Sequence, residues 1–289
     1  QWQPKISWTW EATDEFNTYA SWGLGFRSGG FNSIGSEATI NNTFGSYATA
    51  PQNTKDDYDK EVTSTFEIGA KSDWLDDKLR VNAAVFYTEV DDYQFFNFYA
   101  GPFGLLRVVS NVDEVTIQGF EVDFQAIAGR YFSFYGSYGY IDSEIEKNKN
   151  RRYTEGNNLP NAPEQTASLG TQFLIGVTES IDFVARLDWQ YVGETWFHTV
   201  QDNTTTNFFT DLSAIYGPGF GFGEGNFDKT KRDSFDTLNL RLSLEEENWV
   251  LTAWGTNITD EDYLEEVIPA PEFGGSFNHP AKGEAYGVD

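Results

Sequence analysis

Apolar and polar residues alternate with a period of two along most of this chain. In the clearest run, Leu238, Leu240, Leu242 and Leu244 occupy every second position. Because successive side chains of a β-strand point to opposite faces, this spacing predicts strands with one apolar and one polar face. Helical periodicity is scarce by comparison, so the sequence predicts an all-β fold. Three further alternating runs begin at Phe183, Phe120 and Val81.

Eleven segments have the alternation of strands, and the connections between them are alternately short and long. Long strands joined by short turns at one end and long loops at the other are typical of an outer-membrane β-barrel. The predicted strands are residues 4–10, 16–27, 61–75, 79–96, 106–126, 131–146, 161–176, 181–199, 234–245, 249–263 and 283–289. The predicted long loops are residues 28–60, 97–105, 147–160, 200–233 and 264–282.

The physics of a bilayer explains this pattern. Lipid offers no water to unpaired backbone groups, so membrane-spanning strands must close into a ring. Apolar residues then face lipid, polar residues face the lumen, and aromatic residues gather at the two interfaces. Phe, Tyr and Trp make up 17% of the chain, which fits that demand. A soluble β-sandwich with one buried face would also alternate, but strand length and loop asymmetry favour a transmembrane antiparallel β-barrel.

The composition excludes several classes of function. A formal net charge of -26 argues against nucleic acid as a partner, because phosphates would be repelled. The absence of Cys excludes disulfides, thiolate zinc sites and cysteine catalysis. With His198 and His279 as the only histidines, no metal site, no cofactor and no Ser-His-Asp arrangement is expected.

Five segments resemble one family of bacterial outer-membrane proteins. Residues 19–32 look like one of its barrel segments, and Phe66-Glu67-Ile68-Gly69-Ala70-Lys71 resembles its Tyr-Glu-Ile-Gly-x-Lys strand. Gly119-Phe120-Glu121 resembles its Gly-x-Glu strand, and Leu159-Pro160-Asn161-Ala162-Pro163 its loop-to-strand junction. Asn257-Ile258-Thr259-Asp260-Glu261-Asp262-Tyr263 resembles its Asn-Leu-Thr-Asp-x-x-Tyr signature. In this order, over nearly the whole chain, the segments resemble TonB-dependent outer-membrane receptors.

The resemblance implies a 22-stranded barrel, of which residues 1–289 form the C-terminal half, with the last of about eleven strands incomplete. The first strands and an N-terminal plug domain with its TonB box are expected upstream. Such receptors sit in the bacterial outer membrane and import scarce ligands, most often ferric siderophores, with energy passed through TonB. The implied partners are therefore the plug, TonB, an iron chelate and outer-membrane lipid. One departure is Glu284, where the family usually has Arg.

Four residues are candidates for ligand contact. Trp196 and His198 lie near the loop end of the predicted strand 181–199 and could touch an iron chelate or haem. The alternative for both is an interfacial aromatic belt with one polar histidine. Arg151 and Arg152 belong to the one basic extracellular stretch, which could attract an anionic ferric complex or lipid phosphate. The alternative there is a solvated loop.

Two glutamates are candidates for contact with the plug. Alternation turns Glu67 and Glu121 toward the lumen, on strands that flank the predicted strand 79–96. Their Cα atoms would lie roughly 10 Å apart, plus any stagger. The resemblance implies that these glutamates grip plug arginines; the alternative is solvation by channel water. Most of the negative charge falls outside the long loops, so we expect an acidic lumen and a plug that presents Arg and Lys to it.

Two other functions fit parts of the pattern. A soluble or secreted β-rich carbohydrate-binding protein would be extracted without detergent, and an outer-membrane hydrolase would need a Ser or Asp paired with His198. We expect a receptor rather than an enzyme; siderophore, haem, cobalamin and oligosaccharide are all possible ligands. Side chains expected to face lipid are Leu238, Leu240, Leu242, Leu244, Phe183, Leu187 and Trp189, and those expected to face the lumen are Asn239, Arg241, Arg186 and Asp188.

Overall fold

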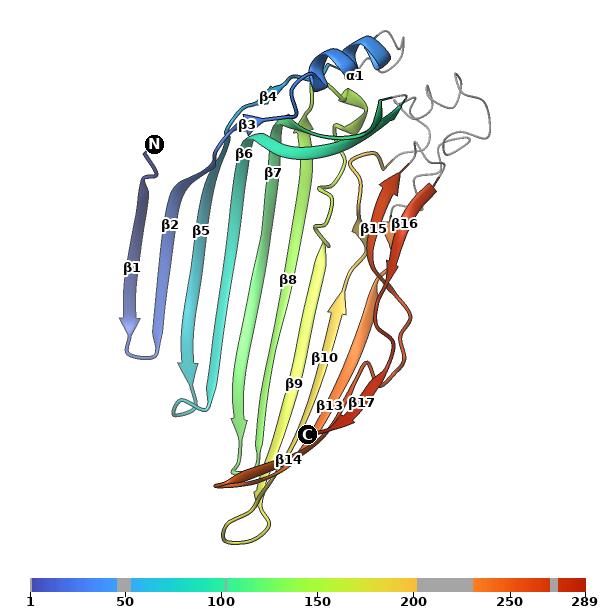
Figure 1. Cartoon of the computed structure of the whole chain (residues 1–289). Coiled ribbons are helices and arrows are strands. Elements are labelled where there is room, and N and C mark those ends of the chain that lie inside the picture. Colours follow the sequence, from blue (N-terminus) through green and yellow to red (C-terminus); the bar gives the residue numbers. More distant parts are fainter. Residues whose placement is uncertain (1, 46–52, 102, 202–230, 271–274) are drawn as a thin grey trace.

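The computed structural model describes residues 2–45, 53–101, 103–201, 231–270 and 275–289. Its main element is an eleven-stranded sheet in the order β1-β2-β5-β6-β7-β8-β9-β10-β13-β14-β17 (Figure 1). Each strand pairs antiparallel with its neighbours in this series, so the eleven predicted strands form an up-and-down meander. Their bounds are β1 (Lys5–Thr13), β2 (Phe16–Arg27), β5 (Glu61–Trp74), β6 (Leu79–Gly101), β7 (Gly104–Ala128), β8 (Phe132–Lys147), β9 (Gln165–Gly176), β10 (Asp182–Val192), β13 (Phe235–Glu246), β14 (Trp249–Thr256) and β17 (Ala285–Val288).

The long connections contain short elements, which gather at one end of the sheet in Figure 1. Six of these elements pair in two-stranded ladders: β3 with β4, β11 with β12, and β15 with β16. Most of the predicted loop 200–233 lies outside the described residues. The short elements are β3 (Gly30–Phe31), α1 (Ser36–Phe44), β4 (Asp57–Tyr58), η1 (Arg152–Thr154), β11 (Thr195–Trp196), β12 (Lys231–Arg232), β15 (Leu264–Ala270) and β16 (Gly275–Pro280).

The prediction of a loop at residues 97–105 is wrong. β6 and β7 continue through it, and their register runs from Leu79 opposite Ala126 to Gly101 opposite Gly104. The extra length is stabilised by burial, since Tyr99 and Val108 of this hairpin are only 3% and 1% exposed. They pack in one cluster with Ile40 and Phe44 of α1 and with Val200.

Two predicted strands end seven residues before their predicted ends, and one helix was not predicted. The strand expected at 181–199 ends at Val192, and the strand expected at 249–263 ends at Thr256. Just after Thr256, Asn257 and Asp260 have left-handed φ angles of 47° and 52°, which turn the chain out of the sheet. The helix α1 is too short for its two buried apolar residues to establish a period.

The register separates the sheet into the two faces that alternation predicts. Leu187 lies opposite Leu240 and Phe183 opposite Leu244, so the predicted lipid-facing residues share one face. Exposed apolar side chains cover this face, as with Ile68 at 46% and Phe120 at 41% exposure. The opposite face is polar, and its rows include Lys71, Asn82, Asp123, Ser137, Ser168, Gln190 and Thr237.

Aromatic side chains form two bands on the apolar face. Near the short turns, the ring centroids of Phe132 and Phe173 are 4.9 Å apart. Nearer the loops, the centroid of Phe120 lies 5.8 Å from those of both Tyr138 and Tyr140. From Phe132 to Tyr140 the strand rises about 27 Å at ~3.4 Å per residue. That span is close to the ~25 Å apolar band of a membrane barrel.

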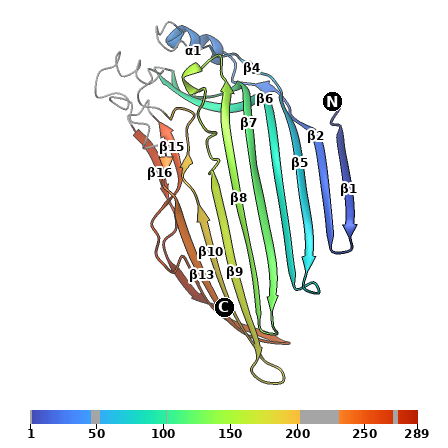
Figure 2. The ribbon, with the colours of Figure 1, turned by 180° about the vertical axis from the view of Figure 1, so that it is seen from behind.

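The sheet carries no second layer along most of its length, as the view from behind shows (Figure 2). The buried apolar side chains gather at the loop end, where Val90, Val115, Ile145 and Leu159 form a second cluster. Within the described ranges, no helix has the length and apolar character needed to cross a membrane.

Candidate functional site

A first group of charged side chains lies on the polar face across β2, β5, β6 and β7. We call Tyr19, Glu67, Lys71, Glu121 and Asp123 the β5–β7 cluster. Tyr19 pairs with Gly69 of the next strand, and a Cβ at Gly69 would lie 2.5 Å from the Tyr19 ring. Because Gly69 has no side chain, the Tyr19 ring can pack directly on the backbone of β5. Lys71 Nζ is 5.9 Å from the centroid of the same ring.

Both predicted glutamates belong to this cluster. The register places Glu67 and Glu121 on the polar face, on the two strands that flank β6. Glu121 lines a hollow of about 260 Å³ together with Tyr19, Lys71 and Asp123, whereas Glu67 is not part of its lining. Neither glutamate forms an ion pair with a described residue. The cluster can therefore accept hydrogen bonds from a cationic group.

A second group lies lower on the polar face, across β8, β9, β10 and β13. Tyr135, Gly170 and Asp188 occupy one row of three adjacent strands. A Cβ at Gly170 would overlap the Tyr135 ring, which crosses the glycine so that its hydroxyl donates to Asp188 Oδ1. Arg186 donates two hydrogen bonds to the same carboxylate, at 2.8 and 3.0 Å. With Arg241, directly opposite Arg186 on β13, these residues form the β8–β13 cluster.

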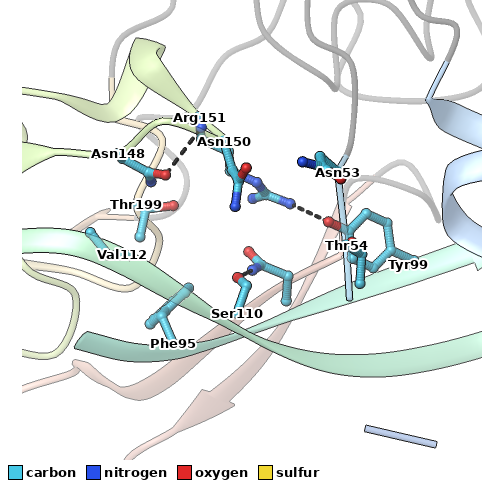
Figure 3. Close-up of a pocket in the computed structure, with 11 residues that line it drawn as sticks. Asn53, Thr54, Phe95, Tyr99, Ser110, Val112, Asn148, Asn150, Arg151 and Thr199 are labelled. Atoms are coloured by element: carbon cyan, nitrogen blue, oxygen red, sulfur yellow. Dashed lines mark hydrogen bonds between the residues drawn. The ribbon is translucent and has the colours of Figure 1, made fainter. Parts of the chain in front are cut away.

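Arg151 is buried among the long connections at the loop end of the sheet, with 6% exposure. Its backbone N–H donates a hydrogen bond to Asn148 Oδ1, and its Nη2 donates one to the Tyr99 hydroxyl. The donor–acceptor distance is 3.1 Å in both (Figure 3). Arg151 lines a cavity of about 20 Å³ together with Ser110 and Thr199. A cavity of that size has room for about one water molecule. Arg151 thus joins the segment that follows β8 to Tyr99 of β6.

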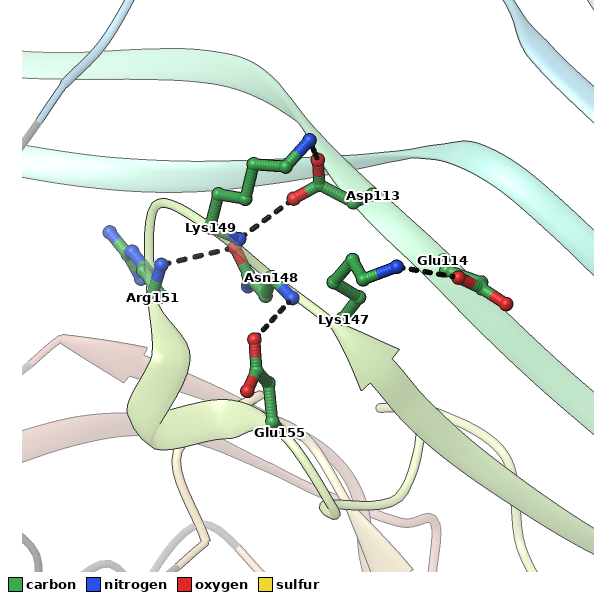
Figure 4. A network of polar contacts seen from close by, with 7 residues as sticks. All are labelled: Asp113, Glu114, Lys147, Asn148, Lys149, Arg151 and Glu155. Atoms are coloured by element: carbon green, nitrogen blue, oxygen red, sulfur yellow. Dashed lines mark hydrogen bonds and ion pairs between the residues drawn. The ribbon is translucent and has the colours of Figure 1, made fainter.

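The rest of the predicted basic stretch is largely neutralised by carboxylates of β7 (Figure 4). Lys149 Nζ lies 2.7 Å from Asp113 Oδ1, and Lys147 Nζ lies 3.3 Å from Glu114 Oε2. Arg152, by contrast, is an exposed cation of this stretch that pairs with no described carboxylate.

His198 and Trp196 lie on the segment that follows β10. The Nδ1 atom of His198 accepts a hydrogen bond of 3.0 Å from the Val200 N–H. Burial, together with the positive charge of Arg151, lowers the pKa of His198 to about 3, so the ring is neutral at neutral pH. Trp196 is half-buried, and Lys231 Nζ lies 5.7 Å from its ring centroid. The structure thus brings His198 close to Arg151, while Trp196 packs with Lys231.

Arg232 is a further cation at this end that the sequence did not single out. Its guanidinium lies 4.8 Å from the Phe235 centroid and 5.4 Å from that of Phe197. It donates hydrogen bonds to the Leu264 carbonyl and to Thr195 Oγ1, at 3.1 and 3.0 Å. Burial lowers its pKa. No sequence signal marked this residue, because its partners come from three separate segments.

The described residues contain no group of three or more His, Cys, Asp or Glu side chains placed to hold a metal ion. Their polar chemistry is therefore that of charged clusters on a wall, with carboxylates on β5–β7 and guanidiniums on β10 and β13.

An antiparallel meander with an exposed apolar face, two aromatic bands and a polar opposite face is the wall of an outer-membrane β-barrel. The family model described as TonB dependent receptor-like, beta-barrel matches residues 1–258. The chain therefore belongs to the TonB-dependent receptors of the bacterial outer membrane. That family consists of receptors, so the predicted class and location are confirmed.

Similar proteins support the same family. The chain is 32% identical over 126 residues to "Probable TonB-dependent siderophore receptor PiuA" of Acinetobacter baumannii, covering 40% of this chain and 16% of the relative. It is 25% identical over 193 residues to "Metal-pseudopaline receptor CntO" of Pseudomonas aeruginosa, covering 66% of this chain and 23% of the relative. The ferric yersiniabactin uptake receptor FyuA from Yersinia pestis superposes with a TM-score of 0.69 at 17% identity, covering 98% of this chain and 36% of FyuA. The chain thus spans about a third or less of each.

Proposed function

We propose that the protein containing this chain imports a ferric siderophore across the outer membrane, with energy delivered through TonB. The observation that carries the proposal is the 32% identity to PiuA, which is named as a siderophore receptor. The fold likeness to FyuA supports the wall architecture alone, because the identity there is 17%.

The extracellular end offers a surface for such a ligand. In the proposed receptor, Arg152 and Trp196 contact the ligand from the loops, since Arg152 is exposed and Trp196 is half-buried. Arg151 and His198 act indirectly, because their side chains pack among the loops and fix their arrangement. A planar guanidinium suits an anionic ferric chelate, since it presents several donors in one plane.

The polar wall offers a surface for a plug domain. In the proposed receptor, Glu67 and Glu121 hold arginines of the plug, and neither glutamate has an ion-pair partner among the described residues. A 22-stranded transporter barrel has a plugged lumen. Paired carboxylates on adjacent parts of one wall are suited to bind planar guanidinium groups.

Uptake of radioactive iron tests the proposed function. The complete receptor is expressed in a bacterial strain without its own siderophore receptors, and ferric siderophores of several chemical types are supplied. We expect saturable accumulation with at least one siderophore and none in a matched strain without TonB. Accumulation that is identical with and without the receptor, for every siderophore, would contradict the proposal.

A second candidate function is uptake of a metallophore complex of a metal other than iron. The match to CntO, named as a metal-pseudopaline receptor, favours this alternative, and it covers 66% of the chain. The same strains supplied with radioactive zinc or nickel and a metallophore distinguish the two. Receptor-dependent accumulation of zinc or nickel, without accumulation of iron, would select the second candidate.

A further inference from the structure

Two arginines face each other across neighbouring strands of the wall. Arg186 of β10 lies directly opposite Arg241 of β13 in the ladder register, and both side chains are exposed on the polar face. Directly opposite residues have Cβ atoms about 4.5–5.5 Å apart, and like charges in such pairs are destabilising. The pair is therefore a local concentration of positive charge on a chain whose net charge is -26.

The two guanidiniums differ in their surroundings. Arg186 is held by Asp188 through two hydrogen bonds and lies 5.1 Å from the Tyr135 ring centroid. Arg241 forms no ion pair with a described residue. The other neighbour of Arg241 is Trp254, whose indole N–H already donates to Asp289. One unit of positive charge at this point of the wall is thus left uncompensated by the described residues.

The nearest other carboxylates on this face of β10 and β13 do not neutralise Arg241. Asp182 and Glu245 form the next charged pair on the same face, four residues along each strand. At ~3.3 Å per residue, that is about 13 Å away. The charges on the wall are therefore separated in space, with carboxylates in the β5–β7 cluster and an uncompensated guanidinium in the β8–β13 cluster.

We propose that Arg186 and Arg241 together bind a carboxylate side chain of the domain that fills the barrel. This inference rests on the proposed function, because it requires a plug inside the lumen. Two adjacent guanidiniums bind one carboxylate through charge-assisted hydrogen bonds, and the ligand relieves their mutual repulsion. The plug then presents basic residues to the β5–β7 cluster and an acidic residue to the β8–β13 cluster. This arrangement replaces the uniformly basic plug surface that net charge alone predicts.

Opposite charges at two separate points of the wall also fix the orientation of the plug. A plug rotated about the barrel axis would place its acidic residue against Glu67 or Glu121, where like charges repel. The β8–β13 cluster thus serves as a docking site for one face of the plug, while the extracellular segments are left to bind the imported ligand.

Limited proteolysis of the complete receptor in detergent tests the site. The variant Arg241→Glu replaces attraction with repulsion, and Arg241→Gln removes the charge with less disturbance. The matched control is Gln190→Glu, an exposed residue on the same face of β10 that lies opposite the neutral residues Thr237 and Ser168. We expect trypsin to cleave the plug about tenfold faster in Arg241→Glu than in the control, as for the loss of one partly buried charge pair. We expect Arg241→Gln to be intermediate and thermal unfolding of the barrel to be unchanged.

Two results would overturn the proposal, and they can be told apart. Plug cleavage in Arg241→Glu and Arg241→Gln at the rate of Gln190→Glu would show that the guanidinium binds no part of the plug. A complete wild-type protein without any protease-protected domain would overturn this site and the proposed plugged receptor together. Restoration of slow cleavage in Arg241→Glu by a Glu→Lys or Asp→Lys exchange in the plug would identify the bound carboxylate.

Discussion

His198 links the packing of the extracellular end to pH. Burial and the charge of Arg151 lower its pKa to about 3 in the folded protein, whereas the unfolded chain takes up this proton below about 6.5. The unfolded state thus binds more protons between these values, so stability is complete above pH ~6.5 and is lost as the pH falls toward 3. We expect amide exchange at residues 197–200, corrected for intrinsic rates, to be faster at about pH 5 than at about pH 7.5.

The variant His198→Gln checks the source of that effect. It keeps a polar group at the position but cannot be protonated, so the difference between the two pH values should largely disappear. His279→Gln is the control, because His279 is exposed on β16. An undiminished pH effect in His198→Gln would assign the effect to another group.

Gly170 and Tyr135 form the residue pair on which the β8–β13 cluster depends. Any Cβ at position 170 overlaps the tyrosine ring, so Gly170→Ala must push Tyr135 away from Asp188. We expect a loss of about 1–3 kcal/mol in barrel stability, the usual cost of overpacking. Gly25→Ala is the matched control, since a Cβ there finds its nearest neighbour at 3.9 Å. Equal unfolding temperatures of the two variants would contradict this role of Gly170.

Among the elements, the helix α1 and the β6–β7 hairpin stabilise each other. Phe44 is fully buried, and its ring centroid lies 6.0 Å from the ring centroid of Tyr99 near the end of β6. We expect Phe44→Ala to cost about 3–5 kcal/mol locally and to speed amide exchange in both α1 and residues 97–100. Asn42→Ala, on the exposed side of the helix, is the control. Faster exchange in α1 alone would mean that the β6–β7 hairpin is stable without the helix.

The sequence predicted the eleven strands because each one alternates, and alternation is a local property. It did not predict α1 or the full length of β6 and β7, because those depend on contacts between distant segments. Phe44 and Tyr99 are 55 positions apart, and only their packing shows why both segments are ordered. The pairing of Glu67 and Glu121 around β6 followed from alternation and strand order. The burial of Arg151, and the roles of Arg186 and Arg232, needed tertiary contacts that no spacing reveals.

Across the whole molecule, part of the negative charge lies outside the lumen. On the face that carries the apolar band, the loop end of the sheet turns acidic beyond Tyr87 and Tyr140, with Glu89, Asp142 and Glu144. A carboxylate is costly within the hydrocarbon but not at the polar margin of a bilayer. The change from apolar to acidic side chains on this face therefore marks the extracellular margin of the bilayer.

This division of the faces predicts opposite effects for two adjacent substitutions. Leu240 lies on the apolar face opposite Leu187, whereas Asn239 lies on the polar face opposite Asp188. Leu240→Arg should cost ~2–4 kcal/mol, if it lies near the bilayer midplane. Asn239→Arg should cost less, because its side chain points to the lumen opposite a carboxylate and the loss is limited to the hydrogen bond that Asn239 Oδ1 accepts from the Asn257 N–H. Folding titrations of the complete receptor into lipid vesicles measure both, and similar losses would contradict the assignment of the faces.

The proposed grip of Glu67 and Glu121 on the plug predicts a separation between plug stability and ligand binding. Removing both carboxylates leaves plug cations without partners inside the barrel, at a cost of about 3–5 kcal/mol for a buried pair. In the complete receptor, Glu67→Ala with Glu121→Ala should lower the unfolding temperature of the plug in calorimetry. Ligand affinity should largely survive, because both residues lie on the wall below the extracellular segments. Glu89→Ala with Glu144→Ala is the matched control, since it removes two carboxylates from the opposite face. If the plug unfolds at the same temperature as in this control, the two glutamates do not hold the plug. If only ligand affinity falls, both glutamates belong to the ligand-binding site instead.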